Sequence, residues 1–502
     1  MSLANIYTCT LTGITTHTVT VEVHLANGLP SLSIVGLPEA AVRESKDRVR
    51  AAIINSNFEF PQRRITINLA PADLPKDGGR FDLPIALGIL AASSQIPPDA
   101  LHDYEFHGEL ALSGELRSIK GALPAALHTK QSQRSLIIPK QNLTESLLAE
   151  DVTILAANNL LEVCQFLTDQ TPLTDHSDSS VNIDNRTDPY LCMSDIKGQQ
   201  RAKRALEVAA AGQHNLLMIG PPGTGKTMLA SRITSILPPM TQQQAIESAA
   251  IHSISDHQFE TIRWQTRPFR SPHHTASGVA LVGGGSHPKP GEISLAHHGV
   301  LFLDELTEFD RKVLDVLREP LETGQITISR AARQADFPAK FQLIAAMNPC
   351  PQGYNCDGKD LCQCTPEQQK KYRSKISAPL LDRIDIHIEV PQVPRQILQQ
   401  QNTSEGSDTI RERVLNAYQK QMERHGKINA ELSNKELEQS CRLNTAEQQL
   451  IDKAMEKLKL SARAYHRILK LARTIADLDA KDDINTQHLS EAISYRSLDR
   501  LQ

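Results

Sequence analysis

The feature that most constrains the fold of this chain is a glycine-rich segment between two apolar stretches. It follows the short apolar run 216–219 and precedes a helical pattern that begins at Met228. A strand that turns through such a loop into a helix surrounds an anion with backbone N–H groups at the positive end of the helix dipole. The segment therefore predicts a P-loop that binds the phosphates of ATP, rather than a chance glycine-rich turn. Its residues are Gly220, Pro221, Pro222, Gly223, Thr224, Gly225, Lys226 and Thr227. Within it, Lys226 can reach the β- and γ-phosphates, and the Thr227 hydroxyl can hold Mg²⁺.

Two further apolar runs end in polar residues suited to nucleotide chemistry. The run 300–303 is followed by Asp304 and Glu305, and the run 343–346 leads through Met347 to Asn348. Strands that are apolar at every position are typical of a parallel sheet covered by helices on both faces. Asp304 would orient Mg²⁺, Glu305 would polarise the attacking water, and Asn348 would help to hold that water. Alone, paired acidic residues or an Asn-Pro turn would indicate only a solvated strand end, but the preceding P-loop favours the catalytic interpretation.

The length of 502 residues and the shifts in composition predict a multidomain protein of the α/β class. Early strand patterns alternate with helices, including one predicted over 42–54 with Val42, Val49, Ile53 and Ile54 on one side. A polar, acidic segment without periodicity follows, which is typical of a linker. The predicted domains are an α+β domain (1–168), a linker (169–189), an α/β ATPase domain (190–394) and a C-terminal helical lid (395–502).

Composition also excludes several classes of protein. The formal net charge is −4, so any surface that binds nucleic acid must be local. No apolar run approaches the roughly 18 residues of a membrane span. The first residues have neither the positive region nor the apolar core of a signal peptide. We therefore expect a cytoplasmic protein without membrane contact.

These elements, in this order, resemble the AAA+ family, in the branch that contains magnesium-chelatase motor subunits and MCM helicases. Residues 380–385 look like the strand-end element that carries the trans-acting arginine finger of that branch, and 461–467 look like its sensor-2 helix. The likeness implies that Arg383 reaches the γ-phosphate in a neighbouring subunit and that Arg463 contacts the nucleotide from the lid. Arginine suits both roles because it stays charged and binds phosphate oxygens in fork geometry. Without the P-loop, a surface salt bridge would be the favoured interpretation of each.

Two basic loops are candidates for DNA contact. Residues 326–333 alternate like a strand and include Arg330 and Arg333. In the same branch this segment is a hairpin that points into the pore of a hexamer, which implies that both arginines bind DNA phosphates. A glycine-rich, proline-flanked loop with His287 and Lys289 resembles the helix-2 insert of that branch. For any one of these residues alone, ordinary exposed charge on a hairpin is the alternative.

Over nearly its whole length the chain resembles the ComM/YifB family of magnesium chelatase-related AAA+ proteins. The likeness implies a homo-hexameric, ATP-dependent helicase that drives branch migration of DNA during homologous recombination in natural transformation. Its expected partners are single-stranded and branched DNA and other recombination proteins. Two alternatives stay open: a motor for metal insertion, as in the magnesium chelatases, and a scaffold whose ATP site controls assembly. The N-terminal extension favours the DNA motor, because the chelatase motor subunit lacks it.

The N-terminal domain looks like the Lon-type protease domain, without its catalytic pair. In Lon proteases the segment that resembles residues 75–78 is followed by Pro and the nucleophilic Ser, but here Gly79 and Arg80 follow. Leu123 stands at the position that matches the catalytic Lys. Loss of both groups removes the Ser–Lys chemistry, so we expect a scaffold or DNA-handling domain.

Four cysteines fall within 15 residues: Cys350, Cys356, Cys362 and Cys364. Four thiolates on a short loop can form a tetrahedral site for structural Zn²⁺. The spacing lacks paired CxxC knuckles, and buried free thiols or a redox-labile pair are the alternatives. Two pairs of adjacent histidines, 273–274 and 297–298, are expected to have diverging side chains, which favours polar turns over metal sites.

Overall fold

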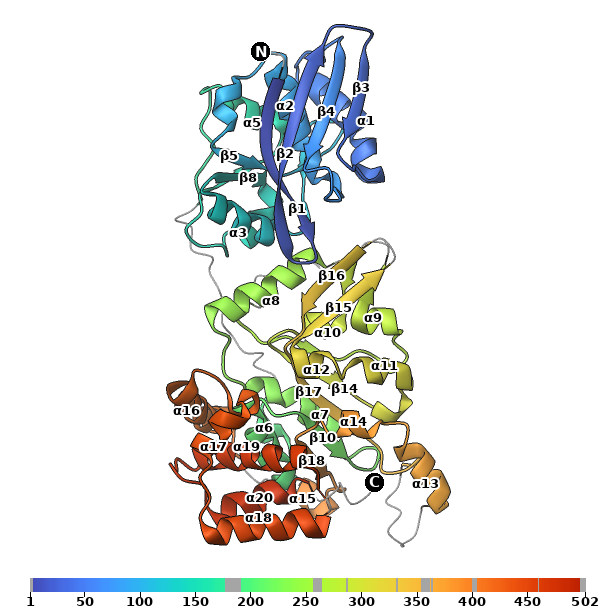
Figure 1. Ribbon diagram of the computed structural model, residues 1–502, viewed down its shortest axis with the longest axis vertical. Coiled ribbons are helices and arrows are strands. Elements are labelled where there is room, and N and C mark those ends of the chain that lie inside the picture. Colours follow the sequence, from blue (N-terminus) through green and yellow to red (C-terminus); the bar gives the residue numbers. More distant parts are fainter. Residues whose placement is uncertain are drawn as a thin grey trace. The chain divides into compact units, whose positions relative to one another are not determined.

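The computed structural model describes residues 3–176, 191–255, 264–285, 288–330, 333–353, 362, 364–399, 404–458 and 460–496, apart from the side chains of Arg330, Arg333 and Leu398. The chain divides into two compact units (Figure 1). The first unit comprises Met1–Asp184 and Ile246–Trp264, and the second comprises Asn185–Ala245 and Gln265–Gln502. The division follows packing, so the first unit includes a segment that the sequence places in the middle of the second.

The first unit is built on a mixed sheet (Figure 1). Its elements are β1 Leu3–Thr12, β2 Thr15–Ala26, β3 Ser31–Val35, α1 Ala40–Asn55, β4 Arg64–Ala70, α2 Asp82–Ala92, β5 Tyr104–Phe106, β6 Glu109–Leu110, β7 Leu116–Arg117, α3 Ala122–Ser132, β8 Ser135–Pro139, α4 Leu143–Ser146, β9 Ile154–Ala157 and α5 Leu160–Leu167. Seven of these strands are ordered β3-β4-β2-β1-β5-β8-β9. The β1–β2 and β2–β4 pairs are antiparallel, and the remaining pairs are parallel. Helix α2 is buried over its entire length, so it forms the centre of this unit's core.

Helix α1 contains the predicted helix 42–54, but one of the four residues predicted for its buried side is exposed. Val42, Val49 and Ile53 are fully buried, as predicted, but Ile54 is 50% exposed. Consecutive residues of a helix are separated by about 100° around its axis. Ile54 therefore points away from the face that Ile53 buries.

The positions that match the Lon catalytic pair are both buried and hold no Ser–Lys pair. The guanidinium of Arg80 donates to the carbonyl oxygen of Lys120, and burial lowers its pKa. Cys9 and His107 lie close by, with 3.8 Å between Sγ and Nε2. Burial raises the pKa of the Cys9 thiol to about 12 and lowers the pKa of His107 to about 3. Both groups are therefore neutral at neutral pH, which does not suit a thiolate nucleophile.

One helix passes from the second unit into the first. Helix α8 (Gln242–Ile254) begins in the second unit, and its larger part belongs to the first. Within the first unit, the carbonyl oxygen of Ser253 accepts a hydrogen bond from the N–H of Gly121 at 2.9 Å. The described part of this segment, residues 246–255 and Trp264, thus belongs to the first unit although it lies in the middle of the second in sequence.

The second unit is an α/β sandwich followed by a group of helices. It contains the start of α8 and α6 Gln200–Gly212, β10 Leu216–Ile219, α7 Lys226–Arg232, β11 Phe269–Arg270, α9 Gly278–Val282, β12 Gly283–Gly284, β13 Lys289–Pro290, α10 Glu292–Leu295, β14 Val300–Leu303, α11 Arg311–Val316, α12 Pro320–Thr323, β15 Gln325–Arg330, β16 Arg333–Pro338, β17 Gln342–Met347, α13 Pro366–Arg373, α14 Ala378–Leu381, β18 Ile386–Glu389, α15 Arg395–Gln399, α16 Ser407–His425, α17 Asn434–Ser440, α18 Thr445–Leu458, α19 Ala462–Leu478 and α20 Thr486–Ser494. Five of the described strands form a parallel sheet in the order β11-β14-β17-β10-β18. The three apolar runs of the sequence form β10, β14 and β17, which lie side by side at its centre.

The C-terminal helices share the core of this sheet. Helices α16 and α19 pack on α6, and Figure 1 shows them gathered with α17, α18 and α20 in orange to red. Their buried apolar residues belong to the same cluster as β10, β14 and β17. Among the described residues, no helix has both the length and the apolar character needed to cross a membrane.

The buried carboxylate of Asp385, just before β18, joins the helices to the sheet. It accepts hydrogen bonds from the N–H of Asn215 at 2.9 Å and from the guanidinium of Arg467 on α19 at 2.6 Å. The ring of His214 lies 3.7 Å away. Burial alone would raise the pKa of Asp385, but the charge of Arg467 and the hydrogen bonds outweigh it, so the pKa lies well below its usual range.

We predict that Asp385→Asn destabilises the second unit by about 3 kcal/mol, because it leaves the half-buried Arg467 without its counter-charge. A folded-state pKa below the unfolded one adds stability at neutral pH that is lost as pH falls below about 4. The difference in Tm between wild type and variant should therefore shrink under acid, as calorimetry between pH 7 and pH 3 would measure. The control is Glu308→Gln, which removes an exposed pair with Lys375 and should change Tm little. If the difference in Tm between wild type and Asp385→Asn did not change with pH, the lowered pKa of Asp385 would be wrong.

Candidate nucleotide site

The parallel register brings three strand ends together at one edge of the second unit's sheet. Residue Ile219 of β10 pairs with Met347 of β17, and Leu303 of β14 pairs with Ala345. The P-loop follows β10, Asp304 and Glu305 follow β14, and Asn348 follows β17. At the start of the P-loop, a Cβ on Gly220 would collide with the carbonyl oxygen of Val390. Glycine at this position therefore allows the loop to leave β10 beside its neighbouring strand.

Lys226 lies at the first position of α7, and its ammonium group points back into the loop. It donates to the carbonyl oxygens of Gly220 at 2.7 Å and Pro221 at 3.0 Å, and to Oδ1 of Asn348 at 3.2 Å. Burial lowers its pKa, although the charges of Asp304 and Glu305 act in the opposite direction. The ammonium group thus joins the P-loop to the end of β17.

Two oxygen ligands suited to Mg²⁺ lie in direct contact. The hydroxyl of Thr227 donates to Oδ2 of Asp304 at 2.6 Å. Hydroxyl and carboxylate oxygens are the ligands that Mg²⁺ uses beside nucleotide phosphates. The donor set therefore fits the ion and the residues predicted for it.

The carboxylate of Glu305 is held by a residue that the sequence did not predict. Its Oε2 lies 3.1 Å from Nδ1 of His274. His274 belongs to the loop after β11, the strand that pairs with β14. Glu305 itself has a left-handed backbone conformation with φ of 51°, which is uncommon for a residue with a side chain. Its direction is therefore set both by its backbone and by His274.

The expected divergence of adjacent histidine rings was wrong. The ring centroids of His273 and His274 lie 4.2 Å apart, and those of His297 and His298 lie 3.9 Å apart. The sequence pointed to the pair 273–274 only as a polar turn. It gave no reason to place His274 beside Glu305, because that position depends on β11, a strand of only two residues.

Arg383 and Arg463 lie at the opposite edge of the sheet from the P-loop. Arg383 follows α14 and precedes β18, at the N-terminal end of that strand, and it pairs with Glu322. Arg463, at the start of α19, has its guanidinium 3.8 Å from Asp382. A four-residue strand spans about 13 Å. The structure therefore does not bring either arginine to the P-loop of its own chain.

Comparisons with known proteins agree with this architecture. Family models for magnesium chelatase subunit ChlI match residues 21–142 and 192–398, and the model for its C-terminal region matches 404–496. The competence protein ComM of Haemophilus influenzae is 53% identical over the whole of this chain and 99% of its own length. YifB of Escherichia coli is 49% identical over the whole chain and 98% of its length. Lon protease 2 of Bacillus subtilis is 26% identical over 31% of this chain and 32% of its own length.

This chain belongs to the ComM/YifB family of magnesium chelatase-related AAA+ proteins.

In this member of the family, the structure describes only part of the predicted DNA-contact segments. Strands β15 and β16 form an antiparallel hairpin in which Arg330 pairs with Arg333 at the end. The side chains of both arginines, and the whole of His287, lie outside the described residues. Lys289 lies on β13, opposite Gly284 of β12.

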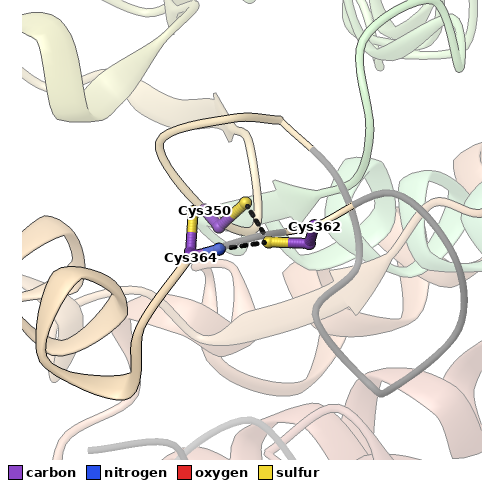
Figure 2. Close-up of side chains that lie close together, drawn as sticks. All are labelled: Cys350, Cys362 and Cys364. Atoms are coloured by element: carbon purple, nitrogen blue, oxygen red, sulfur yellow. Dashed lines mark hydrogen bonds between the residues drawn. The ribbon is translucent and has the colours of Figure 1, made fainter.

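The predicted cysteine cluster is partly described. Cys350, Cys362 and Cys364 place their sulfur atoms within 4.8 Å of one another (Figure 2). The fourth predicted ligand, Cys356, lies outside the described residues. The three thiols come from the segment after β17 and the segment before α13.

We predict that Lys226→Ala and Glu305→Gln separate nucleotide binding from hydrolysis. Loss of the ammonium group removes charge-assisted hydrogen bonds, so ATP should bind about 10- to 100-fold more weakly. Glu305→Gln keeps the shape of the site but removes the proton acceptor, so turnover should fall at least about 100-fold with little change in affinity. Binding of a fluorescent ATP analogue and phosphate release measure the two effects. Wild-type turnover of Glu305→Gln would contradict the role assigned to Glu305.

Proposed function

We propose that this chain is an ATP-driven, homo-hexameric DNA helicase that promotes branch migration during homologous recombination in natural transformation. The observation that carries the proposal is the full-length similarity to a competence protein, combined with a nucleotide site whose parts lie together at one sheet edge. ATP and Mg²⁺ are its cofactors, and single-stranded and branched DNA are its partners.

Each residue of the site has a distinct role in this proposal. The ammonium group of Lys226 moves from the loop carbonyls to the phosphates, and Thr227 and Asp304 hold Mg²⁺. Glu305 accepts a proton from the attacking water, which Asn348 helps to position. Bound MgATP supplies the phosphoanhydride bond whose hydrolysis drives the motor. His274 fixes the direction of the Glu305 carboxylate.

The two arginines at the far sheet edge support a ring of identical subunits. Arg383 and Arg463 have guanidinium groups on the same side of the second unit, linked through neighbouring Asp382 and Glu322. In a ring, that side of one subunit would meet the P-loop side of the next. Both arginines would then bind the neighbour's nucleotide, and an isolated subunit would lack a complete site.

Mixing of two inactive variants tests this arrangement. Arg383→Ala has an intact P-loop, whereas Lys226→Ala has an intact arginine. In mixed rings, some interfaces will pair the intact P-loop of one variant with the intact Arg383 of the other. These interfaces should hydrolyse ATP, and the recovered rate should be highest when the two variants are mixed in nearly equal amounts. The control mixes Arg383→Ala with Glu305→Gln/Arg383→Ala, which offers no intact arginine. Absence of recovery in rings shown to be mixed would contradict action in trans.

A motor for metal insertion is the second candidate, because the family models that match 21–142, 192–398 and 404–496 are all those of magnesium chelatase. The match over 21–142 means that the N-terminal domain alone does not separate the two functions. The two functions differ in what stimulates hydrolysis. DNA should raise the ATPase rate of a helicase, whereas a chelatase motor should respond to its partner subunit. A scaffold would show neither response.

The β15–β16 hairpin provides the sharpest test of the DNA motor. Arg330→Ala/Arg333→Ala should weaken DNA binding without base preference and reduce its salt dependence, because each lost phosphate contact removes nearly one released counterion. Basal ATPase should persist, while unwinding of three- and four-way junctions should fall at least about tenfold. Arg311→Ala/Arg318→Ala is the control, since these arginines are exposed and lie 4.0 Å from the carboxylate of Asp315. If branch migration were unchanged in the hairpin variant, Arg330 and Arg333 would not be contacts for the DNA.

A further inference from the structure

Three cysteine sulfurs converge next to the nucleotide site (Figure 2). The Sγ atoms of Cys350 and Cys362 are 3.5 Å apart, and the N–H of Cys364 donates to Sγ of Cys362 at 3.4 Å. Cys350 is fully buried, and none of the three cysteines forms a disulfide. These residues come from two segments separated in sequence, so their convergence is a property of the fold.

The spacing suits a tetrahedral soft cation. Zinc–thiolate bonds of about 2.3 Å in a tetrahedron place the sulfur atoms about 3.8 Å apart. All three sulfur atoms lie within 4.8 Å of one another, and one pair is closer than that value. Small side-chain rotations would bring them to Zn²⁺, which is favoured by thiolates over the harder Mg²⁺.

On one side, the segment that carries Cys350 lies against the P-loop through Gly353. Cys350 follows Asn348 by two residues, and Asn348 accepts a hydrogen bond from Lys226. Gly353 donates to the carbonyl oxygen of Cys350 at 2.9 Å and has φ of 82°. A Cβ on Gly353 would lie 2.9 Å from Cγ and Cδ of Pro222. The segment after β17 is thus packed against the loop that would hold the phosphates.

On the other side the cluster is anchored to the segment after Glu305. Thr365, which follows Cys364, caps α13 and accepts a hydrogen bond from the N–H of Gln368. At the end of this helix, the hydroxyl of Tyr372 accepts a hydrogen bond from Thr307 at 2.6 Å. An ion held by the three sulfurs would therefore tie α13 and the region of Glu305 to the segment that packs on Pro222.

We propose that Cys350, Cys362 and Cys364 bind Zn²⁺, and that the bound ion holds the segment 349–353 against Pro222, so that nucleotide affinity depends on the metal. This inference depends on one part of the proposed function, namely that the P-loop binds the nucleotide. The zinc would be structural, because none of the three cysteines is among the residues assigned to the nucleotide or to the attacking water.

Metal content is the first readout. Protein purified without added metal should contain about one zinc per chain by elemental analysis. Cys362→Ser/Cys364→Ser should contain none, and Cys192→Ser, which removes a thiol outside the cluster, should retain it. Exchange for Co²⁺ should give the intense visible absorption of tetrahedral thiolate ligation in wild type and in Cys192→Ser alone. Absence of zinc and of cobalt binding in wild type, or a Cys350–Cys362 disulfide found by mass spectrometry, would overturn the metal site.

Nucleotide affinity is the second readout. Removal of zinc by a chelator should weaken binding of a fluorescent ATP analogue about tenfold, and added zinc should restore it. Gly353→Ala should keep its zinc and show the same weakening, because the new Cβ pushes the segment away from Pro222. Circular dichroism confirms that each protein remains folded. Unchanged affinity in both zinc-free protein and Gly353→Ala would overturn the coupling. Lys226→Ala should retain its zinc, so failure of the nucleotide assignment is distinguishable from failure of the metal site.

Discussion

The parallel register of β10, β14 and β17 is the constraint on which the nucleotide site depends. Each strand is short and buried on both faces, and each ends at the same edge of the sheet. Residues that lie 77 positions apart in sequence, Thr227 and Asp304, therefore meet in a hydrogen bond. A slip of one residue in either pairing would turn the strand-end side chains to the other face and would separate these groups.

The same sheet has a second functional edge. At the amino-terminal ends of its strands, Asp385 gathers Asn215, His214 and Arg467 into one buried polar network. This network fixes α19 against the sheet, and it does so near Arg383 and Arg463. A movement of the C-terminal helices would therefore shift Arg383 and Arg463, at the edge of the sheet opposite the chain's own P-loop. If these arginines bind a neighbouring subunit's nucleotide, as proposed, the movement would change that neighbour's site.

The sequence predicted the centre of this fold better than its periphery. All-apolar runs and a glycine-rich loop have few alternative structures, so β10, β14, β17 and the site at their ends were accessible to prediction. Ile54 was misplaced because one residue of helical rotation separates a buried from an exposed side chain. The contact of His274 with Glu305 depends on a two-residue strand, which leaves no periodic signal. The cysteines could be counted, but the approach of Gly353 to Pro222 arises only from how the chain turns after β17.

The segment 246–264 gives the chain an unusual connectivity. Because it packs in the first unit while both of its ends continue into the second, the backbone crosses between the units three times: near 184, at 245 and at 264. The N-terminal domain is therefore not an appendage that can be removed at the linker. Cutting the chain there would leave the carbonyl oxygen of Ser253 without the N–H of Gly121, in the stretch between the P-loop and Glu305. A protein trimmed to its ATPase region would therefore leave the C-terminal part of α8 without the unit to which it belongs.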